Sequence, residues 1–382
     1  MSKTEIEFPL ETTVFAALEL SKGSWLLAIH STDRSQPSMH HIKGGDVAGL
    51  LTRLNRASEQ HKLRTRKEAK VVVCFEAGYD GLWLARWLEE HDVRCFVIDA
   101  SSLEVNRRAR RPKTDRIDAA KLVRTLMAWC RGERDACSMV RVPSREDEDL
   151  RRSHRERSRL VRERTAHINR IKGLLFAYGV RITNIRYRCD KIKLDELLTG
   201  DGHPLPPRLR SELDREIVRL KLVKQQIAEV EKERDEADAS CSKSEAIRHR
   251  LIKLRGIGPA FAAILTREVY YRSFENRRQV GSYIGLTPSP HDSGQSETCR
   301  GISKSGNAMA RSVMIEAAWL WLKHQPSSRL SQWYQQRTAG HVGRIRRIMI
   351  VALARKLAVA FWRFLERGTI PDGAICARLP RA

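Results

Sequence analysis

The chain has 382 residues, of which 41% are hydrophobic, and this length and composition predict two or three globular domains. Lysine and arginine outnumber aspartate and glutamate by 71 to 46, and the resulting charge of +25 indicates a polyanionic partner such as nucleic acid. No stretch approaches the roughly eighteen apolar residues of a membrane span and no signal-peptide-like run is present, so we expect a cytoplasmic protein with no membrane partner.

The first third of the chain alternates between apolar strands and amphipathic helices. The segments expected as strands are 14–20, 25–29, 39–42, 71–75 and 95–99. The segments expected as helices between them are 46–57 and 82–88. A hairpin comes first and crossover connections follow, which is typical of an RNase H-like domain, a mixed sheet flanked by helices.

Two acidic residues lie on the expected strands. Glu19 is inside the first strand, and Glu76 follows the fourth strand directly. These two strands are neighbours in an RNase H-like sheet, so the carboxylates could meet at its carboxyl edge. A charged acid in an apolar strand costs several kcal/mol if it stays unpaired, so either a cation or an arginine should accompany each one.

A helix is expected to begin after Pro112, with Thr114 as its N-cap. Asp115 and Asp118 are three residues apart and therefore share one face of its first turns. They either provide the negative charge that favours a helix start or share a cation. Together with the two glutamates they would make four carboxylates, which are suitable ligands for Mg²⁺ or Mn²⁺ beside a phosphodiester.

Basic residues dominate two segments of the middle of the chain. The residues expected to contact nucleic acid there are Arg107, Arg108, Arg110, Arg111, Lys113, Arg155, Arg159 and Arg162. Arginine also suits folded RNA, in which phosphate and stacking contacts dominate. The alternative is an ordinary solvated helix face.

A charged helix with a regular apolar seam follows the Gly- and Pro-rich break at 199–207. The seam residues are Leu209, Leu213, Ile217, Leu220, Ile227 and Val230. Their spacing of mostly three or four is typical of a coiled coil, so we expect an antiparallel hairpin with the preceding Arg-rich helix, and also dimerisation.

The last third is expected to be mostly helical. Segment 251–265 fits a helix-hairpin-helix, in which Gly256 and Gly258 allow a tight turn and backbone N–H groups can hold a phosphate; the alternative is an ordinary helix corner. Gly, Pro and Ser predict a long functional loop over 285–307, with Ser293 as a candidate nucleophile. A helix carrying Arg311 and a final helix over 342–366 follow.

These patterns predict an α/β plus α protein in three parts. Residues 1–135 form the mixed-sheet domain, 136–245 a basic helical and coiled-coil region, and 246–382 a mostly helical C-terminal domain.

Taken in order, the motifs of this chain resemble those of the DEDD-type transposases of the insertion-sequence one-ten family, relatives of the Piv-type site-specific invertases. The matching stretches are Ala17–Lys22, Phe75–Gly78, Lys113–Ala119, Arg255–Pro259, Tyr283–Pro288, Ser293–Gly294 and Ile302–Asn307. They extend over nearly the whole chain. The resemblance implies a RuvC-like N-terminal domain, a coiled-coil linker and a C-terminal transposase domain that act on donor and target DNA at the bacterial nucleoid.

The resemblance also implies a mechanism. The four acids Glu19, Glu76, Asp115 and Asp118 would hold Mg²⁺, and Ser293 would attack a DNA phosphate to form a covalent phosphoserine. In the enzymes that this chain resembles, the metal site and the serine can come from different protomers of a tetramer assembled from dimers. A structured noncoding RNA, the bridge RNA, guides donor and target choice in that family. Lys304 and Arg311, beside the last motif, join the expected nucleic-acid contacts.

One residue departs from the family pattern. The first acid of the family is usually Asp, whereas this chain has Glu19. The additional methylene moves the carboxylate by roughly an ångström, and Mg²⁺ tolerates poor geometry badly. Either the strand is displaced to compensate or this acid contributes less than the other three.

Two further functions remain open from the sequence. A RuvC-like nuclease or resolvase would use two metal ions and water without a covalent intermediate, and it differs from the recombinase at Ser293. A nucleic-acid-binding protein without catalysis would use its acids only for capping and pairing, so its function would not depend on Asp118.

Overall fold

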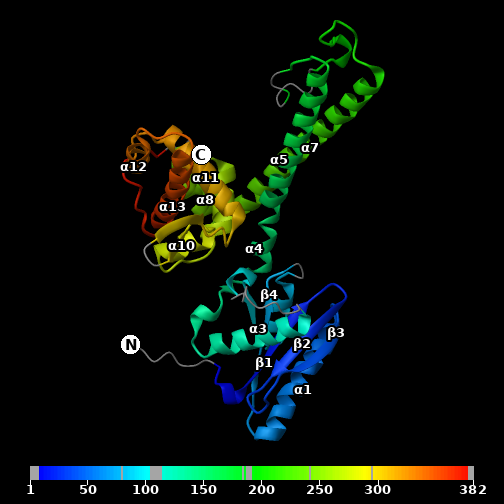
Figure 1. Cartoon of the computed structure of the whole chain (residues 1–382), viewed down its shortest axis with the longest axis vertical. Helices are drawn as coiled ribbons and strands as arrows, with labels where there is room; N and C mark the ends of the chain where they lie inside the picture. Colours follow the sequence, from blue (N-terminus) through cyan, green and yellow to red (C-terminus); the bar gives the residue numbers. More distant parts are fainter. Residues whose placement is uncertain are drawn as a thin grey trace. The chain divides into compact units, whose positions relative to one another are not determined.

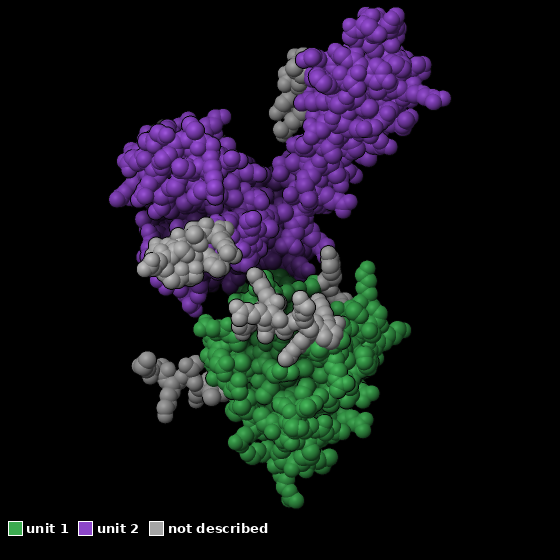
Figure 2. Space-filling view, viewed as in Figure 1, with its two compact units in different colours: residues 1–144 green, residues 145–382 purple. Residues whose placement is uncertain are grey.

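The computed structural model describes residues 8–78, 81–103, 114–182, 185, 192–240, 242–293 and 296–376, with only the backbone described for 237–240, 242–243, 290–293 and 296–300. The chain forms two compact units, residues 1–144 and 145–382, called unit 1 and unit 2 below (Figure 2). The division into three parts with boundaries at 135 and 245 stays a prediction.

Unit 1 contains the predicted strands and helices in the predicted order. Its strands are β1 (Thr13–Leu20), β2 (Ser24–His30), β3 (Ser38–Lys43), β4 (Lys70–Glu76), β5 (Arg94–Ile98) and β6 (Met139–Val140). Its helices are α1 (Val47–Thr65), α2 (Trp83–Glu89) and α3 (Asp115–Cys130), with short 3₁₀ turns at Leu10–Thr12, Ala100–Ser102 and Arg134–Ala136.

The strands of unit 1 form one mixed sheet in the order β3-β2-β1-β4-β5-β6. Strand β1 is parallel to β4 and antiparallel to β2, which confirms that the first and fourth strands are neighbours. Leu50 and Leu54 of α1 and Leu84 of α2 pack on one face, and Leu122 and Leu126 of α3 pack on the other. Helix α3 runs across the strands (Figure 1). The result is a three-layer α/β unit.

Unit 2 begins with a helical hairpin. Its elements are α4 (Arg145–Asp149), α5 (Arg152–Ala177), a 3₁₀ turn at Leu194–Glu196 and α7 (Pro207–Ser240). Ion pairs between α5 and α7 join Arg157 to Glu231 at 2.5 Å and His167 to Glu216 at 2.7 Å, so the helices are antiparallel. Figure 1 shows them side by side. The seam residues predicted on α7 are buried, which confirms the hairpin, whereas dimerisation stays a prediction.

The rest of unit 2 is mostly helical. Its helices are α8 (Ser242–Ile252), α9 (Pro259–Leu265), the π-helical turn η6 (Thr266–Tyr270), α10 (Arg277–Ile284), α11 (Ala308–His324), α12 (Arg329–Thr338) and α13 (Arg344–Arg367). Gly256 turns the chain between α8 and α9 with a φ of +97°, and a Cβ there would lie 3.0 Å from the Cβ of His324. Glycine is therefore required by both backbone conformation and space, as the helix-hairpin-helix prediction supposed.

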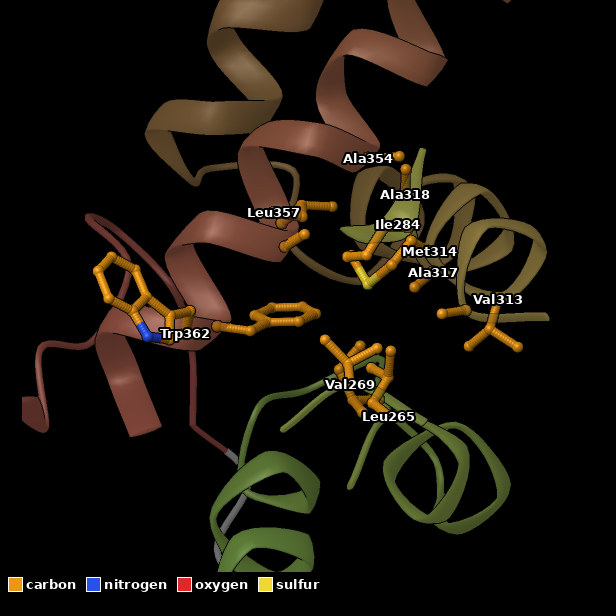
Figure 3. Close-up of a cluster of buried hydrophobic side chains, with 14 of the residues drawn as sticks. Leu265, Val269, Ile284, Val313, Met314, Ala317, Ala318, Ala354, Leu357 and Trp362 are labelled. Carbon is orange, nitrogen blue, oxygen red and sulfur yellow. The ribbon is translucent and has the colours of Figure 1, made fainter. Parts of the chain in front are cut away.

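One large hydrophobic core holds these helices together. Figure 3 shows side chains of α9, η6, α10, α11 and α13 converging, among them Val269, Met314 and Leu357. Trp321 and Phe361 are fully buried and pack with ring centroids 5.7 Å apart. Each buried side chain of this size contributes about 2–3 kcal/mol. Within the described ranges, no helix is both long enough and apolar enough to cross a membrane.

The prediction of a long loop over residues 285–307 is wrong. Strands β7 (Pro288–Ser293) and β8 (Ser296–Ile302) form an antiparallel hairpin there, with a register irregularity between Pro288 and Pro290. Proline cannot donate a ladder hydrogen bond, which is why its presence argues against a strand. A two-stranded hairpin tolerates it because each strand has a free edge, so the composition hid the pairing.

Candidate functional site

Glu19 and Glu76 occupy corresponding positions on adjacent parallel strands. The register pairs Leu18 with Phe75, and each glutamate is the next residue along its strand. Both are partly exposed. Side chains alternate between faces, and Ala17 of β1 and Cys74 of β4 belong to the cluster beneath α3. The glutamates, two residues further on, therefore share the face that α3 covers.

Helix α3 carries the two aspartates to this same face. Thr114 caps the helix through its Oγ1, which accepts a hydrogen bond from the N–H of Ile117 at 3.4 Å, as the sequence predicts. The Cys74 thiol donates to the carbonyl of Leu122 at 3.7 Å, which fixes the second turn of α3 above β4. Asp118 lies one turn before Leu122 on the helix. The start of α3 therefore faces the sheet side that bears the glutamates.

The flank of α3 opposite Asp118 has a different environment. Ile117, Ala120 and Arg124 line a cavity with residues 35–37 and 39, and Ile117 is 44% exposed rather than buried. Residues 35–37 connect β2 to β3, next to the end of β2 that pairs with the start of β1. Helical geometry, at 100° per residue, puts Asp118 on the other flank, towards the carboxyl ends of β1 and β4.

The four carboxylates do not form a closed site in the structure. Within the described ranges, no group of three or more His, Cys, Asp or Glu side chains is close enough to hold a metal ion. Asp115 is exposed and Asp118 is partly exposed. Neither aspartate forms an ion pair with another residue that the structure describes. Their chemistry still fits Mg²⁺ or Mn²⁺, because both ions prefer carboxylate oxygens.

The predicted nucleic-acid contacts have varied surroundings. Arg107, Arg108, Arg110, Arg111 and Lys113 lie outside the described residues. Arg159 and Arg162 remain on the α5 surface, where Arg159 pairs with Glu163 and Arg162 donates to the carbonyl of Ser158.

Further along the chain, Gly258 is extended at the start of α9, and Lys304 is exposed with a φ of 58°. The guanidinium of Arg311 donates to the carbonyls of Ile284 and Lys304, at 3.3 and 2.9 Å. Arg311 therefore ties the chain before β7 to the chain after β8.

Ser293 is the last residue of β7, where it pairs in register with Ser296. The side chain of Ser293 lies outside the description, as does Gly294. The serine therefore lies in unit 2, where β7 ends at the tip of the β-hairpin.

Unit 2 also contains a buried acid that the sequence interpretation missed. The side chain of Glu268 is 1% exposed and lies in the π-helical turn η6. His154 and Arg155 of α5 reach its Oε1 at 2.7 and 2.8 Å. Asn307 donates to its Oε2 at 2.7 Å. π-Helical turns are frequent at functional sites, because they redirect a side chain out of the regular helical order.

The surroundings of Glu268 keep it charged. Burial opposes ionisation, but the hydrogen bonds from His154 and Arg155 outweigh it and hold the pKa of Glu268 well below the usual range. Asn307 also caps α11, since its Oδ1 accepts from the N–H of Ala310 at 3.0 Å. The network therefore joins α5, η6 and α11. The sequence signal for this acid was weak, because Glu268 directly follows Arg267 at the end of the apolar run 259–265.

Sequence comparisons identify the class of protein. The chain is 43% identical to the putative transposase y4rJ of Sinorhizobium fredii over 95% of this chain and 94% of the relative. It is 31% identical to a probable family 20 transposase of Pseudomonas aeruginosa, over 62% of this chain and 69% of the relative. It is also 30% identical to the transposase for insertion sequence element IS1111A of Coxiella burnetii, over 67% of each chain. All three relatives are named as transposases.

The family profiles agree with these relatives. The profile described as the transposase IS116/IS110/IS902 family matches residues 248–334, and the DEDD transposase profile of IS110 matches residues 45–179. The chain belongs to the IS110 family of transposases and is a DNA transposase, so the predicted resemblance is confirmed. The DEDD match includes Glu76, Asp115 and Asp118 but begins after Glu19. Glu268, Ser293 and Asn307 lie in the other match.

Proposed function

We propose that unit 1 is a RuvC-like catalytic domain that holds Mg²⁺ or Mn²⁺ with Glu19, Glu76, Asp115 and Asp118. The observation that carries this proposal is the matched register of Glu19 and Glu76 on parallel strands, beneath the start of α3. Four hard oxygen ligands drawn to one face suit a divalent cation. Arg116 and Lys121 are on the same helix, so charge pairing is the competing use of these acids.

The proposed reaction is the cutting and rejoining of DNA through Ser293. A divalent cation bound by the carboxylates would polarise the phosphodiester and stabilise its developing charge. Ser293 Oγ forms a bond to phosphorus while the bond from phosphorus to a deoxyribose oxygen breaks. The serine proton passes to solvent, and the released sugar oxygen takes up a proton to become a hydroxyl. Attack by a sugar hydroxyl on the phosphoserine reverses these steps and rejoins DNA.

Detection of a protein–DNA adduct tests this mechanism. Purified protein is incubated with transposon-end DNA and Mg²⁺, separated on a denaturing gel and digested to map the modified residue. We expect an adduct on Ser293 that disappears in Ser293→Ala and persists in Ser289→Ala, a serine of the same strand. Strand cleavage that persists in Ser293→Ala would instead favour a nuclease or resolvase that uses water.

We further propose that a structured bridge RNA guides the choice of donor and target, and that the active form is a tetramer of two dimers. The net charge of +25 and the arginines of α5 support a nucleic-acid partner of this kind. Protein purified from its host should carry one enriched small RNA, and nuclease treatment should abolish site choice. Recovery of no enriched RNA would contradict guidance, and light scattering of the DNA complex tests the tetramer.

A further inference from the structure

A basic groove in unit 2 has no role in the mechanism proposed above. It has a volume of about 720 Å³ and is lined by α10, α12, α13 and the segment 369–372 that follows α13. Six cationic side chains line it: Arg277, Arg278, Arg329, Arg355, Lys356 and Arg363. They come from segments far apart in the sequence, so folding brings these charges together.

These cations are largely uncompensated. Asp372 is the acid that lines the groove, and it pairs with Arg329 at 3.3 Å. The other five form no ion pair with a carboxylate in the part of the chain that the structure describes. Like charges held close together repel one another. Binding of a polyanion relieves this repulsion and is therefore favourable.

Part of the groove lining is apolar and includes an aromatic ring. Leu330, Val359 and Pro371 contribute to it, together with the partly buried Trp333. The ammonium of Lys356 lies over one face of the Trp333 ring, 4.7 Å from its centre, so a cation and an aromatic ring lie together in the groove lining. A duplex presents phosphates but hides its base faces, whereas a single strand offers both. Cationic side chains beside an aromatic ring are therefore suited to binding unpaired nucleotides.

We propose that this groove binds a single strand of DNA, with the phosphates on its arginines and a base against Trp333. The chain belongs to a family of DNA transposases, so a DNA strand is the expected occupant rather than an RNA strand. Cutting and exchanging strands exposes unpaired DNA, which the groove would hold during the reaction. Strand binding at this groove requires neither the metal site nor Ser293, so it can be measured separately from catalysis.

The first experiment compares two pairs of substitutions in the full chain. The groove variant is Arg278→Ala with Arg363→Ala, and the control is Arg344→Ala with Arg347→Ala, which removes equal charge from exposed positions of α13 outside the groove. Fluorescence anisotropy measures binding of a labelled DNA single strand of about 12 nucleotides over a range of salt concentrations. Single-strand affinity should fall about tenfold in the groove variant, and its salt slope by about 1.4.

The second experiment locates the strand. A DNA single strand containing bromodeoxyuridine is crosslinked by ultraviolet light, and the attached peptide is identified by mass spectrometry. We expect attachment to the peptide that contains Trp333, and an about tenfold loss of affinity in Trp333→Leu. The same crosslink should form in Asp118→Asn protein, which separates failure of the groove from failure of the catalytic proposal.

Three outcomes would overturn the inference. Equal losses of affinity in the groove and control variants would show that binding depends on the overall surface charge and not on the groove. Preferential loss of duplex binding in the groove variant would assign the groove to double-stranded DNA. Tighter binding of an RNA strand of the same sequence, with the same crosslink, would assign it to RNA.

Discussion

The acids at the start of α3 and the acid in η6 have opposite surroundings. Asp115 is exposed, Asp118 is partly exposed, and neither has an ion-pair partner among the described residues. Glu268 is buried, and hydrogen bonds from α5 and α11 surround it. The number of donors around a carboxylate thus distinguishes an acid used for structure from one available to a ligand. A fully bonded carboxylate has no lone pairs left for a cation.

The largest effect is expected from Asp118→Asn. The amide keeps the size of the side chain but removes the charge that a cation needs, so strand cleavage should fall about a thousandfold. Gel assays with Mg²⁺ measure cleavage. The control is Asp135→Asn, an exposed acid of unit 1 that should leave activity unchanged. Cleavage at the wild-type rate by the Asp118→Asn variant would show that Asp118 is not a ligand of the metal ion.

Glu268→Ala should mainly affect folding. It leaves the buried His154 and the partly buried Asn307 without their shared acceptor, and a buried polar group without a hydrogen-bond partner costs about 1–3 kcal/mol. Urea unfolding measures the free energy. Glu316→Ala, at an exposed position of α11, is the matched control and should cost under about 0.5 kcal/mol. Equal stabilities would show that the network contributes no net stability.

A pH titration separates the two kinds of acid by a smaller effect. The pKa of Glu268 is lowered on folding, so its contribution is fully present above the unfolded value of about 4.3 and decreases as the pH falls through the lower folded value. The free energy of unfolding should therefore fall with decreasing pH below about 4.3. In Glu268→Gln the slope should be shallower, and an unchanged slope would mean that other acids cause it.

The smallest change is expected from Glu19→Asp. The substitution restores the acid that the family usually has and retains the charge, so cleavage should stay within about tenfold of the wild-type rate. Glu19→Gln, which is matched in length, tests the charge itself and should cost more. A thousandfold loss in the aspartate variant would mean that β1 is placed for the longer side chain.

The sheet and the helical seam could be predicted because local patterns specify them. Short continuous apolar runs marked β1 and β4, and the spacing of Leu213, Ile217 and Leu220 marked the buried side of α7. The charged positions could be predicted in the same way, since Glu19 and Glu76 interrupt apolar strands. The α/β sheet domain and the mostly helical remainder followed from these patterns.

The features that sequence patterns did not predict depend on contacts between distant residues. Glu268 meets His154 and Asn307, which are 114 and 39 positions away, and no local pattern records such a meeting. The β7–β8 hairpin was hidden by its prolines and glycines, which are ordinary loop residues. The basic groove collects cations from three helices, so it exists only after folding.

Asn307 shows how narrowly one position can be specified. Its oxygen caps α11 while its nitrogen donates to Glu268, so one amide serves as acceptor and donor at once. Aspartate would preserve the cap but would bring a second negative charge to the buried carboxylate, and serine is too short to reach both partners. Spontaneous deamidation of this single side chain would therefore convert a bond into a repulsion.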